Sequence, residues 1–193
     1  MIWRNGIPEG CPYRSGGFTV GDHILVNGPV GDHGAVIMSA QAGISLESDL
    51  VSDCAPLHGL IDAIMDWGAH IRFMRDATRG GIVSILNEIA SRANMTIALR
   101  EEDVPVRPEV SAICEILGLE PYYLANEGKV VVVVDPAYSK AVLESMRAHP
   151  LGVDSRCIGE ITASDVPIVV MKTAFGGSRI LDVPVGEALP RIC

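Results

Sequence analysis

A run of five valines, Val130–Val134, decides the fold. Valine is β-branched and favours extended backbone, and an unbroken apolar run of this length is typical of a strand buried on both faces. Pro136 follows two residues later and predicts the first turn of a helix that continues to Met146. We therefore expect this strand to lie inside a sheet, with a helix directly after it.

Hydrophobic periodicity predicts further helices on either side of this strand. The first begins near residue 32 and has Val36, Ile37 and Ala40 on its expected core face, and the second begins at Pro56. Three short strands follow one another at the end of the chain, which favours an α+β layered mixed sheet over a doubly wound parallel fold. Two more helices are expected at 82–93 and 108–117, and strands at 23–27, 71–74, 96–99, 157–161, 168–171 and 180–183.

Composition excludes several classes of function. The chain has 24 Asp and Glu against 15 Lys and Arg, a net charge of -9, which disfavours binding to nucleic acid or to an anionic membrane. It has neither an apolar stretch of about 20 residues nor the apolar core of a signal peptide. The five cysteines include no CxxC pair, which is typical of reduced thiols in the cytoplasm. We expect a cytoplasmic protein without a cysteine zinc site.

A glycine-rich turn lies between a predicted strand and the first predicted helix. Its glycines allow close approach of a ligand to the backbone, and the N–H groups of a helix start favour phosphate. The turn has neither the P-loop nor the dinucleotide-binding pattern. The structural alternative is a tight turn with Asp32 as the N-cap. The turn reads Gly31-Asp32-His33-Gly34.

A second motif precedes the helix predicted at 82–93. Asp76 is suited to bind a metal ion or a backbone N–H, and the guanidinium of Arg79 is suited to phosphate oxygens. Gly80 and Gly81 would leave the helix start open to a ligand. The alternative is a capped helix start, with Thr78 as the cap. The motif reads Asp76-Ala77-Thr78-Arg79-Gly80-Gly81.

The third motif, Asn126-Glu127-Gly128-Lys129, leads into the valine strand. A carboxylate at the mouth of a buried strand is suited to act as a general base or a metal partner. The alternative is a polar turn with a solvated ion pair.

The fourth motif is the chain end, Pro190-Arg191-Ile192-Cys193. Four extended residues span about 13 Å at most, so a terminal thiol there can move between two sites as a swinging arm does. The alternative is a surface thiol without a function.

The four motifs, in this order and spacing, resemble the HypE family of hydrogenase maturation factors, which belongs to the PurM/AIR synthetase-like superfamily. The resemblance covers roughly residues 18–193 and implies a PurM-like carboxy-terminal domain at 18–183. An irregular lead-in at 1–17 would precede it, and a mobile tail at 184–193 would carry the thiol. Family members are usually longer, and their first domain binds Mg²⁺ and ATP and provides much of a homodimer contact. The resemblance implies that this chain lacks that domain.

The resemblance also implies a reaction, the synthesis of cyanide ligands for nickel–iron hydrogenase. A carbamoyltransferase, HypF, would load Cys193 with a carbamoyl group, ATP would drive its dehydration to a thiocyanate, and the HypC–HypD complex would receive the cyano group. Glu127 would be the base or an orienting carboxylate. No metal ligands are expected in this chain, and the residues expected around the nucleotide are Gly31, Asp32, His33, Gly34, Asp76, Thr78, Arg79, Gly80, Gly81 and Asn126.

Two other functions remain open on the sequence. One is a different ATP-using synthetase of the same superfamily, which would not need Cys193. The other is a non-catalytic domain that serves only as a scaffold or binds a partner.

Overall fold

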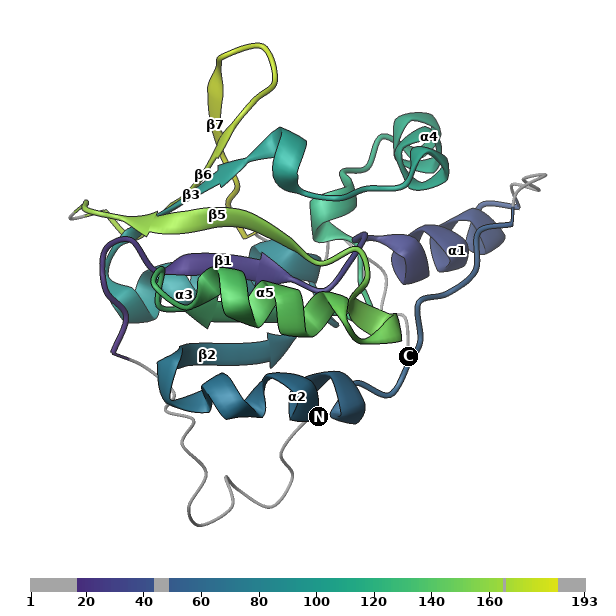
Figure 1. The fold of residues 1–193 in the computed structure, drawn as a ribbon. Coiled ribbons are helices and arrows are strands. Elements are labelled where there is room, and N and C mark those ends of the chain that lie inside the picture. Colours follow the sequence, from purple (N-terminus) through teal and green to yellow (C-terminus); the bar gives the residue numbers. More distant parts are fainter. Residues whose placement is uncertain (1–16, 44–48, 165, 184–193) are drawn as a thin grey trace.

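The computed structural model describes residues 17–43, 49–164 and 166–183 of the chain. Within these ranges seven strands form one sheet in the order β2-β4-β1-β5-β3-β6-β7 (Figure 1). Strands β3 and β6 run parallel, whereas the other neighbours are antiparallel. The mixed sheet confirms the predicted α+β class. The strands are β1 (His23–Val26), β2 (Ile71–Asp76), β3 (Thr96–Arg100), β4 (Val130–Val134), β5 (Arg156–Thr162), β6 (Val169–Lys172) and β7 (Ser178–Ile180).

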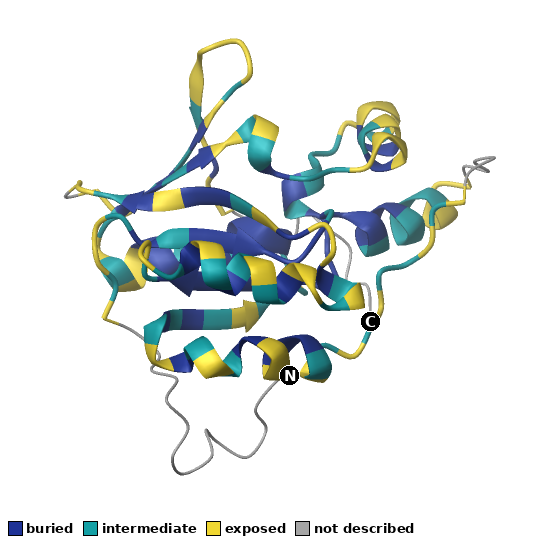
Figure 2. Cartoon of the chain, viewed as in Figure 1, coloured by how far each residue is buried: buried dark blue, intermediate teal, exposed yellow. Residues whose placement is uncertain are grey.

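Helices cover both faces of the central strands (Figure 1). All five valines of β4 are fully buried, as the sequence predicts. Val131 and Val133 pack on one face in a cluster with α3, and the other three valines pack with α2 and α5. Figure 2 shows this buried band through the middle of the molecule. The helices are α1 (Asp32–Gln41), α2 (His58–Ile64), α3 (Gly81–Ala93), α4 (Pro108–Leu117) and α5 (Ser139–Arg147), and the 3₁₀ turns are η1 (Met65–His70), η2 (Glu101–Asp103), η3 (Pro121–Tyr123) and η4 (Pro150–Gly152).

Helix α1 packs beside α4 and buries a different face from the predicted one. Ala35 is fully buried in a small cluster with residues of α4, whereas Val36 and Ile37 are only half-buried and Ala40 is exposed. The contacts of the glycine turn hold the first turn of the helix, so the burial of α1 follows that turn and not the apolar stripe.

Several predicted element boundaries are wrong, including that of β2, which is expected at residues 71–74 but ends at Asp76. Helix α5 begins at Ser139, because Asp135 and the residues after it form a turn in which the N–H of Ala137 donates to Asp135 Oδ1 at 3.0 Å. Helix α2 begins at His58, two residues after Pro56. The last strand, β7, lies at Ser178–Ile180, where it pairs with β6.

Helix α4 begins at Pro108 and ends before Gly118, which has a φ of 64°, as predicted. None of the helices in the described ranges is both long and apolar enough to cross a membrane. The predictions for residues 1–16 and 184–193, Cys193 included, lie outside the described residues.

Candidate functional site

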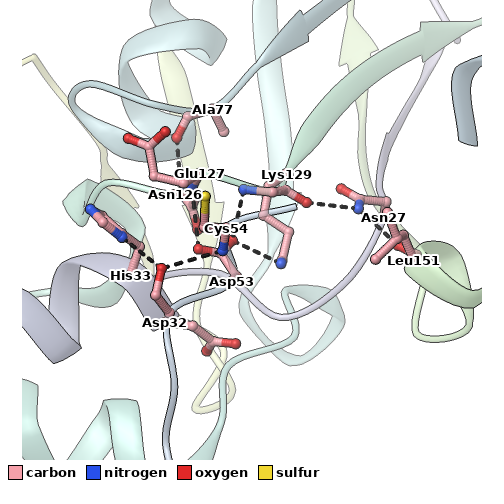
Figure 3. A network of polar contacts seen from close by, with 12 residues as sticks. Asn27, Asp32, His33, Asp53, Cys54, Ala77, Asn126, Glu127, Lys129 and Leu151 are labelled. Atoms are coloured by element: carbon pink, nitrogen blue, oxygen red, sulfur yellow. Dashed lines mark hydrogen bonds and ion pairs between the residues drawn. The ribbon is translucent and has the colours of Figure 1, made fainter. Parts of the chain in front are cut away.

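The side chain of Asn126 joins the three internal motifs. Asn126 is fully buried, and its Oδ1 accepts a hydrogen bond from the N–H of Gly31 at 2.7 Å. Its Nδ2 donates to the carbonyl oxygens of Ala77 at 3.0 Å and Leu124 at 3.1 Å (Figure 3). The structure therefore brings the sequence motifs together. Both N–H groups of the Asn126 amide are used within the chain, so its contacts give it a structural role at this junction.

Two motif glycines make room for the chain's own backbone. A Cβ atom on Gly81, where φ is +59°, would lie 2.3 Å from the carbonyl oxygen of Tyr122. A Cβ on Gly34 would lie 2.8 Å from the Cβ of Leu124, and the N–H of Gly34 already donates to Ala125 at 2.9 Å. The expectation that Gly81 leaves the start of α3 open to a ligand is wrong, because the segment around residues 122–125 occupies that space.

The start of α3 differs from the expected capped helix. Gly80, with a φ of 70°, is the N-cap residue, and no side chain caps the helix. Thr78 is half-buried and Arg79 is exposed. No partner for the guanidinium of Arg79 lies among the described residues. Asp76 ends β2 and pairs in the sheet with Val130.

Asp32 is the first residue of α1 and not its N-cap, which is Gly31. Asp32 Oδ2 accepts a hydrogen bond from Arg107 Nε at 3.0 Å, and the buried Oδ1 has no partner among the described residues. Burial raises the pKa of the Asp32 carboxyl above its usual value, and the hydrogen bond from Arg107 opposes this shift in part.

A cavity of about 390 Å³ lies beside this carboxylate. It is lined by residues 27–29, Asp32, residues of the loop at 49–55, Arg107 and Glu109, Gly128 and Lys129, and residues of the segment 150–154. Five acidic side chains and two basic ones line it. This excess of negative charge disfavours binding of a triphosphate. Of the predicted site residues that the structure describes, only Asp32 lines this cavity.

Asp53, which no sequence motif marks, binds the third motif. Its side chain is 4% exposed and accepts hydrogen bonds from the N–H groups of Glu127 at 3.1 Å and Gly128 at 3.3 Å. It also pairs with Lys129 Nζ at 2.8 Å (Figure 3). Asp53 stands in a loop without any recognisable motif, so no local signal marks it.

The same loop holds His33. Nδ1 of His33 lies 2.8 Å from Ser52 Oγ, which also accepts the N–H of Cys54 at 3.3 Å. Glu127 and Cys54 are both exposed. The loop around residue 53 thus contacts both His33 and the backbone of Glu127.

The described cysteines differ in exposure. Cys114 is buried in the α1–α4 cluster, and burial raises the pKa of its thiol to about 11. Burial also raises the pKa of the half-buried Cys157, whereas Cys54 is exposed. No group of three or more His, Cys, Asp or Glu side chains within the described part of the chain is placed to hold a metal ion.

Comparison with known proteins identifies the family. Residues 19–172 match the family of the AIR synthase related protein, C-terminal domain. A carbamoyl dehydratase HypE from Rhizobium leguminosarum bv. viciae is 49% identical over 187 residues, which are 96% of this chain and 53% of that protein.

Solved structures agree with this assignment. A HypE–HypF complex is 42% identical, with a TM-score of 0.82, and the match covers 86% of this chain and 54% of that chain. A HypE in complex with ATP is 37% identical, with a TM-score of 0.83, over 96% of this chain and 55% of that chain. This chain spans about half the length of the relatives it matches. The chain therefore belongs to the AIR synthase related family and, within it, to the HypE proteins.

Proposed function

We propose that this chain takes part in the ATP-dependent dehydration of a carbamoyl group carried on Cys193, which yields a thiocyanate for the cyanide ligands of nickel–iron hydrogenase. The observation that carries the proposal is the match to HypE proteins along almost the whole chain, with the three internal motifs joined at Asn126. Arg79, two residues after the Ala77 carbonyl that Asn126 binds, is exposed, which suits a residue that contacts a ligand.

The chemistry needs a phosphoryl donor, a base and a carrier thiol. The carboxamide oxygen takes the γ-phosphoryl group of ATP, and ADP leaves. The nitrogen gives up both of its protons as the C–O bond breaks and phosphate departs, so that a C≡N bond remains on sulfur. The overall change is thiocarboxamide plus ATP to thiocyanate, ADP and phosphate.

The residues of this chain divide these tasks. Glu127 would accept a proton from the nitrogen, and its exposure and the hydrogen bond from its backbone N–H to Asp53 support this role. Arg79 and Thr78 contact the phosphates, with His33 at the same site. The N–H groups of Gly31 and Gly34 are already engaged within the chain, so they position the motif and do not bind phosphate.

ATP and Mg²⁺ bind mainly outside this chain in the proposal. An amino-terminal domain like that of the longer relatives would supply the metal-binding carboxylates. Two observations support this: the chain spans about half of its relatives' length, and one of the longer relatives is a HypE in complex with ATP. ATP bound to that amino-terminal domain would then contact Arg79 of this chain.

The rest of the assembly follows from the same reaction. Residues 1–17 would form a lead-in and residues 18–183 the domain. The tail at 184–193 would carry Cys193 into the site. HypF would load the thiol, the HypC–HypD complex would take the cyano group, and two copies would form a homodimer. A free thiol carrier requires a reducing compartment, so we place the reaction in the cytoplasm.

Mass spectrometry of the Cys193 peptide tests the proposal. The chain is joined behind the amino-terminal half of the R. leguminosarum HypE and incubated with HypF, carbamoyl phosphate and ATP. We expect the peptide to gain a carbamoyl group and then to lose one water, and Cys193→Ala to abolish both changes. An unmodified Cys193 peptide, in a mixture in which the intact R. leguminosarum protein is modified, would refute the proposal. ATP turnover that persists in Cys193→Ala would instead favour another synthetase of the superfamily.

A further inference from the structure

We propose that Asp53 is a positioning residue for Glu127: its buried carboxylate holds the backbone of the base in place for proton transfer. The inference rests on the proposed function, in which Glu127 is the base.

The hydrogen bonds of Asp53 favour this role. Oδ1 accepts the N–H of Glu127 at 3.1 Å, while Oδ2 accepts the N–H of Gly128 at 3.3 Å and pairs with Lys129 Nζ at 2.8 Å. One carboxylate therefore binds three consecutive residues of the motif, in a site where its side chain is 4% exposed. Hydrogen bonds to a charged acceptor are the stronger class, and burial limits competition from water.

The contact between the two segments is too close for any side chain at position 128. A Cβ on Gly128 would lie 1.9 Å from the carbonyl oxygen of Asp53. The loop at residues 51–57 has no helix or strand of its own. Its place on the motif therefore depends on contacts such as the three that Asp53 makes with residues 127–129.

The backbone after Glu127 is held from a second side. The side chain of Asn27 donates to the carbonyl oxygen of Gly128 at 3.1 Å and accepts the N–H of Val130 at 2.8 Å. With Asn27 on the β1 side and Asp53 on the loop side, the backbone of Glu127 has little freedom, although its carboxylate is exposed (Figure 3). An exposed base on a rigid backbone suits proton transfer to a substrate that enters from outside.

Asp53 also links the base to His33. Its neighbour Ser52 contacts His33 Nδ1 at 2.8 Å, so the loop that fixes Glu127 fixes the imidazole as well. The simpler reading is that Asp53 only neutralises the nearly buried Lys129. The variant Asp53→Glu separates the two roles, because it keeps the negative charge but moves the carboxylate by one methylene.

Nuclear magnetic resonance of the 193-residue chain tests the contact itself. In Asp53→Glu and Asp53→Asn we expect the amide protons of Glu127 and Gly128 to shift upfield and to exchange about tenfold faster with solvent. The control Asp154→Asn changes an exposed carboxylate that lines the same cavity, and it should leave these signals unchanged. Unchanged Glu127 and Gly128 signals in folded Asp53→Glu would overturn the proposal.

Kinetics of the full-length chimera, in which this chain follows the amino-terminal half of the R. leguminosarum HypE, tests the consequence for the base. We expect Asp53→Glu to lower kcat by about tenfold to a hundredfold while KM for ATP stays within about twofold. In the Glu127→Gln background, Asp53→Glu should not lower kcat further, because the base that Asp53 positions is already absent. An unchanged kcat, or an equal loss in both backgrounds, would overturn the proposal.

The two arms separate this inference from the proposed function. If the wild-type chimera does not dehydrate its carbamoyl group, the proposed function fails, while the resonance experiment still decides whether Asp53 holds the backbone of Glu127. If the wild-type chimera is active and Asp53→Glu matches it, the proposed function stands and the positioning role falls.

Discussion

The N–H of Gly31 and Oδ1 of Asn126 lie 2.7 Å apart, although 95 residues separate them in the sequence. This hydrogen bond fixes the start of α1 against the segment that leads into β4. The same asparagine binds Ala77 and Leu124, so one buried side chain links the parts of the candidate site. The site therefore depends on the integrity of the fold at this residue.

Asn126→Ala should destabilise the protein by about 3 kcal/mol. The substitution removes three side-chain hydrogen bonds and leaves the N–H of Gly31 buried without its partner. Urea unfolding measures the change. The control Gln41→Ala alters an exposed residue and should stay within about 0.5 kcal/mol. A similar, small effect of both substitutions would contradict the role given to Asn126.

Gly81→Ala and Gly118→Ala form a matched pair. Both glycines have a positive φ, +59° and +64°, but a Cβ would meet the carbonyl of Tyr122 only at residue 81. We expect Gly118→Ala to cost about 1 kcal/mol from backbone strain and Gly81→Ala to cost more than about 3 kcal/mol. Thermal unfolding compares them. Equal losses would mean that backbone conformation, and not the close contact, explains the glycine at position 81.

Asp32 should make stability depend on pH. Burial raises its pKa in the folded protein, so the folded state binds the proton more tightly than the unfolded chain. This contribution to stability is complete below the ordinary pKa of 3.8 and is lost as pH rises through the higher folded value. Relative to Asp32→Asn, the wild type should therefore lose free energy of unfolding between about pH 3 and pH 7. The measurement is urea unfolding of both proteins across this range. An increase in the free energy of unfolding of the wild type relative to Asp32→Asn as pH rises would contradict a raised pKa of Asp32.

Cys114 should resist alkylation in the folded protein. With a pKa of about 11, roughly one thiol in a thousand is ionised at about pH 8, and the residue is buried. Exposed Cys54 should react with iodoacetamide first, and Cys114 only after unfolding in denaturant. Peptide mass spectrometry follows both sites. Labelling of Cys114 as fast as Cys54 under native conditions would refute its placement in the core.

Arg79→Ala should weaken the interaction with ATP in the full-length chimera. Since Arg79 is exposed and has no partner among the described residues, its loss should leave the melting temperature unchanged. We expect KM for ATP to rise about tenfold. Arg156→Ala, which removes another exposed arginine, is the control and should leave KM unchanged. An unaltered KM in Arg79→Ala would remove this residue from the phosphate site.

The sequence by itself determined the elements that follow from a local pattern. The valine run marked β4 and its burial on both faces, Pro108 and Gly118 marked the ends of α4, and the motifs marked the family. These signals work because burial periodicity and backbone restrictions act over a few neighbouring residues.

Only the tertiary structure decided how the motifs are used. It showed that Asn126 connects the motifs, that the space beside Gly81 belongs to the chain's own backbone, and that Asp53 reaches Glu127 across 74 residues. Such contacts depend on strand order and on the path of loops such as 51–57, which carry no periodic signal. The physical reason is that a hydrogen bond between distant residues is set by the whole packing arrangement, whereas a local pattern records only which face of an element is buried.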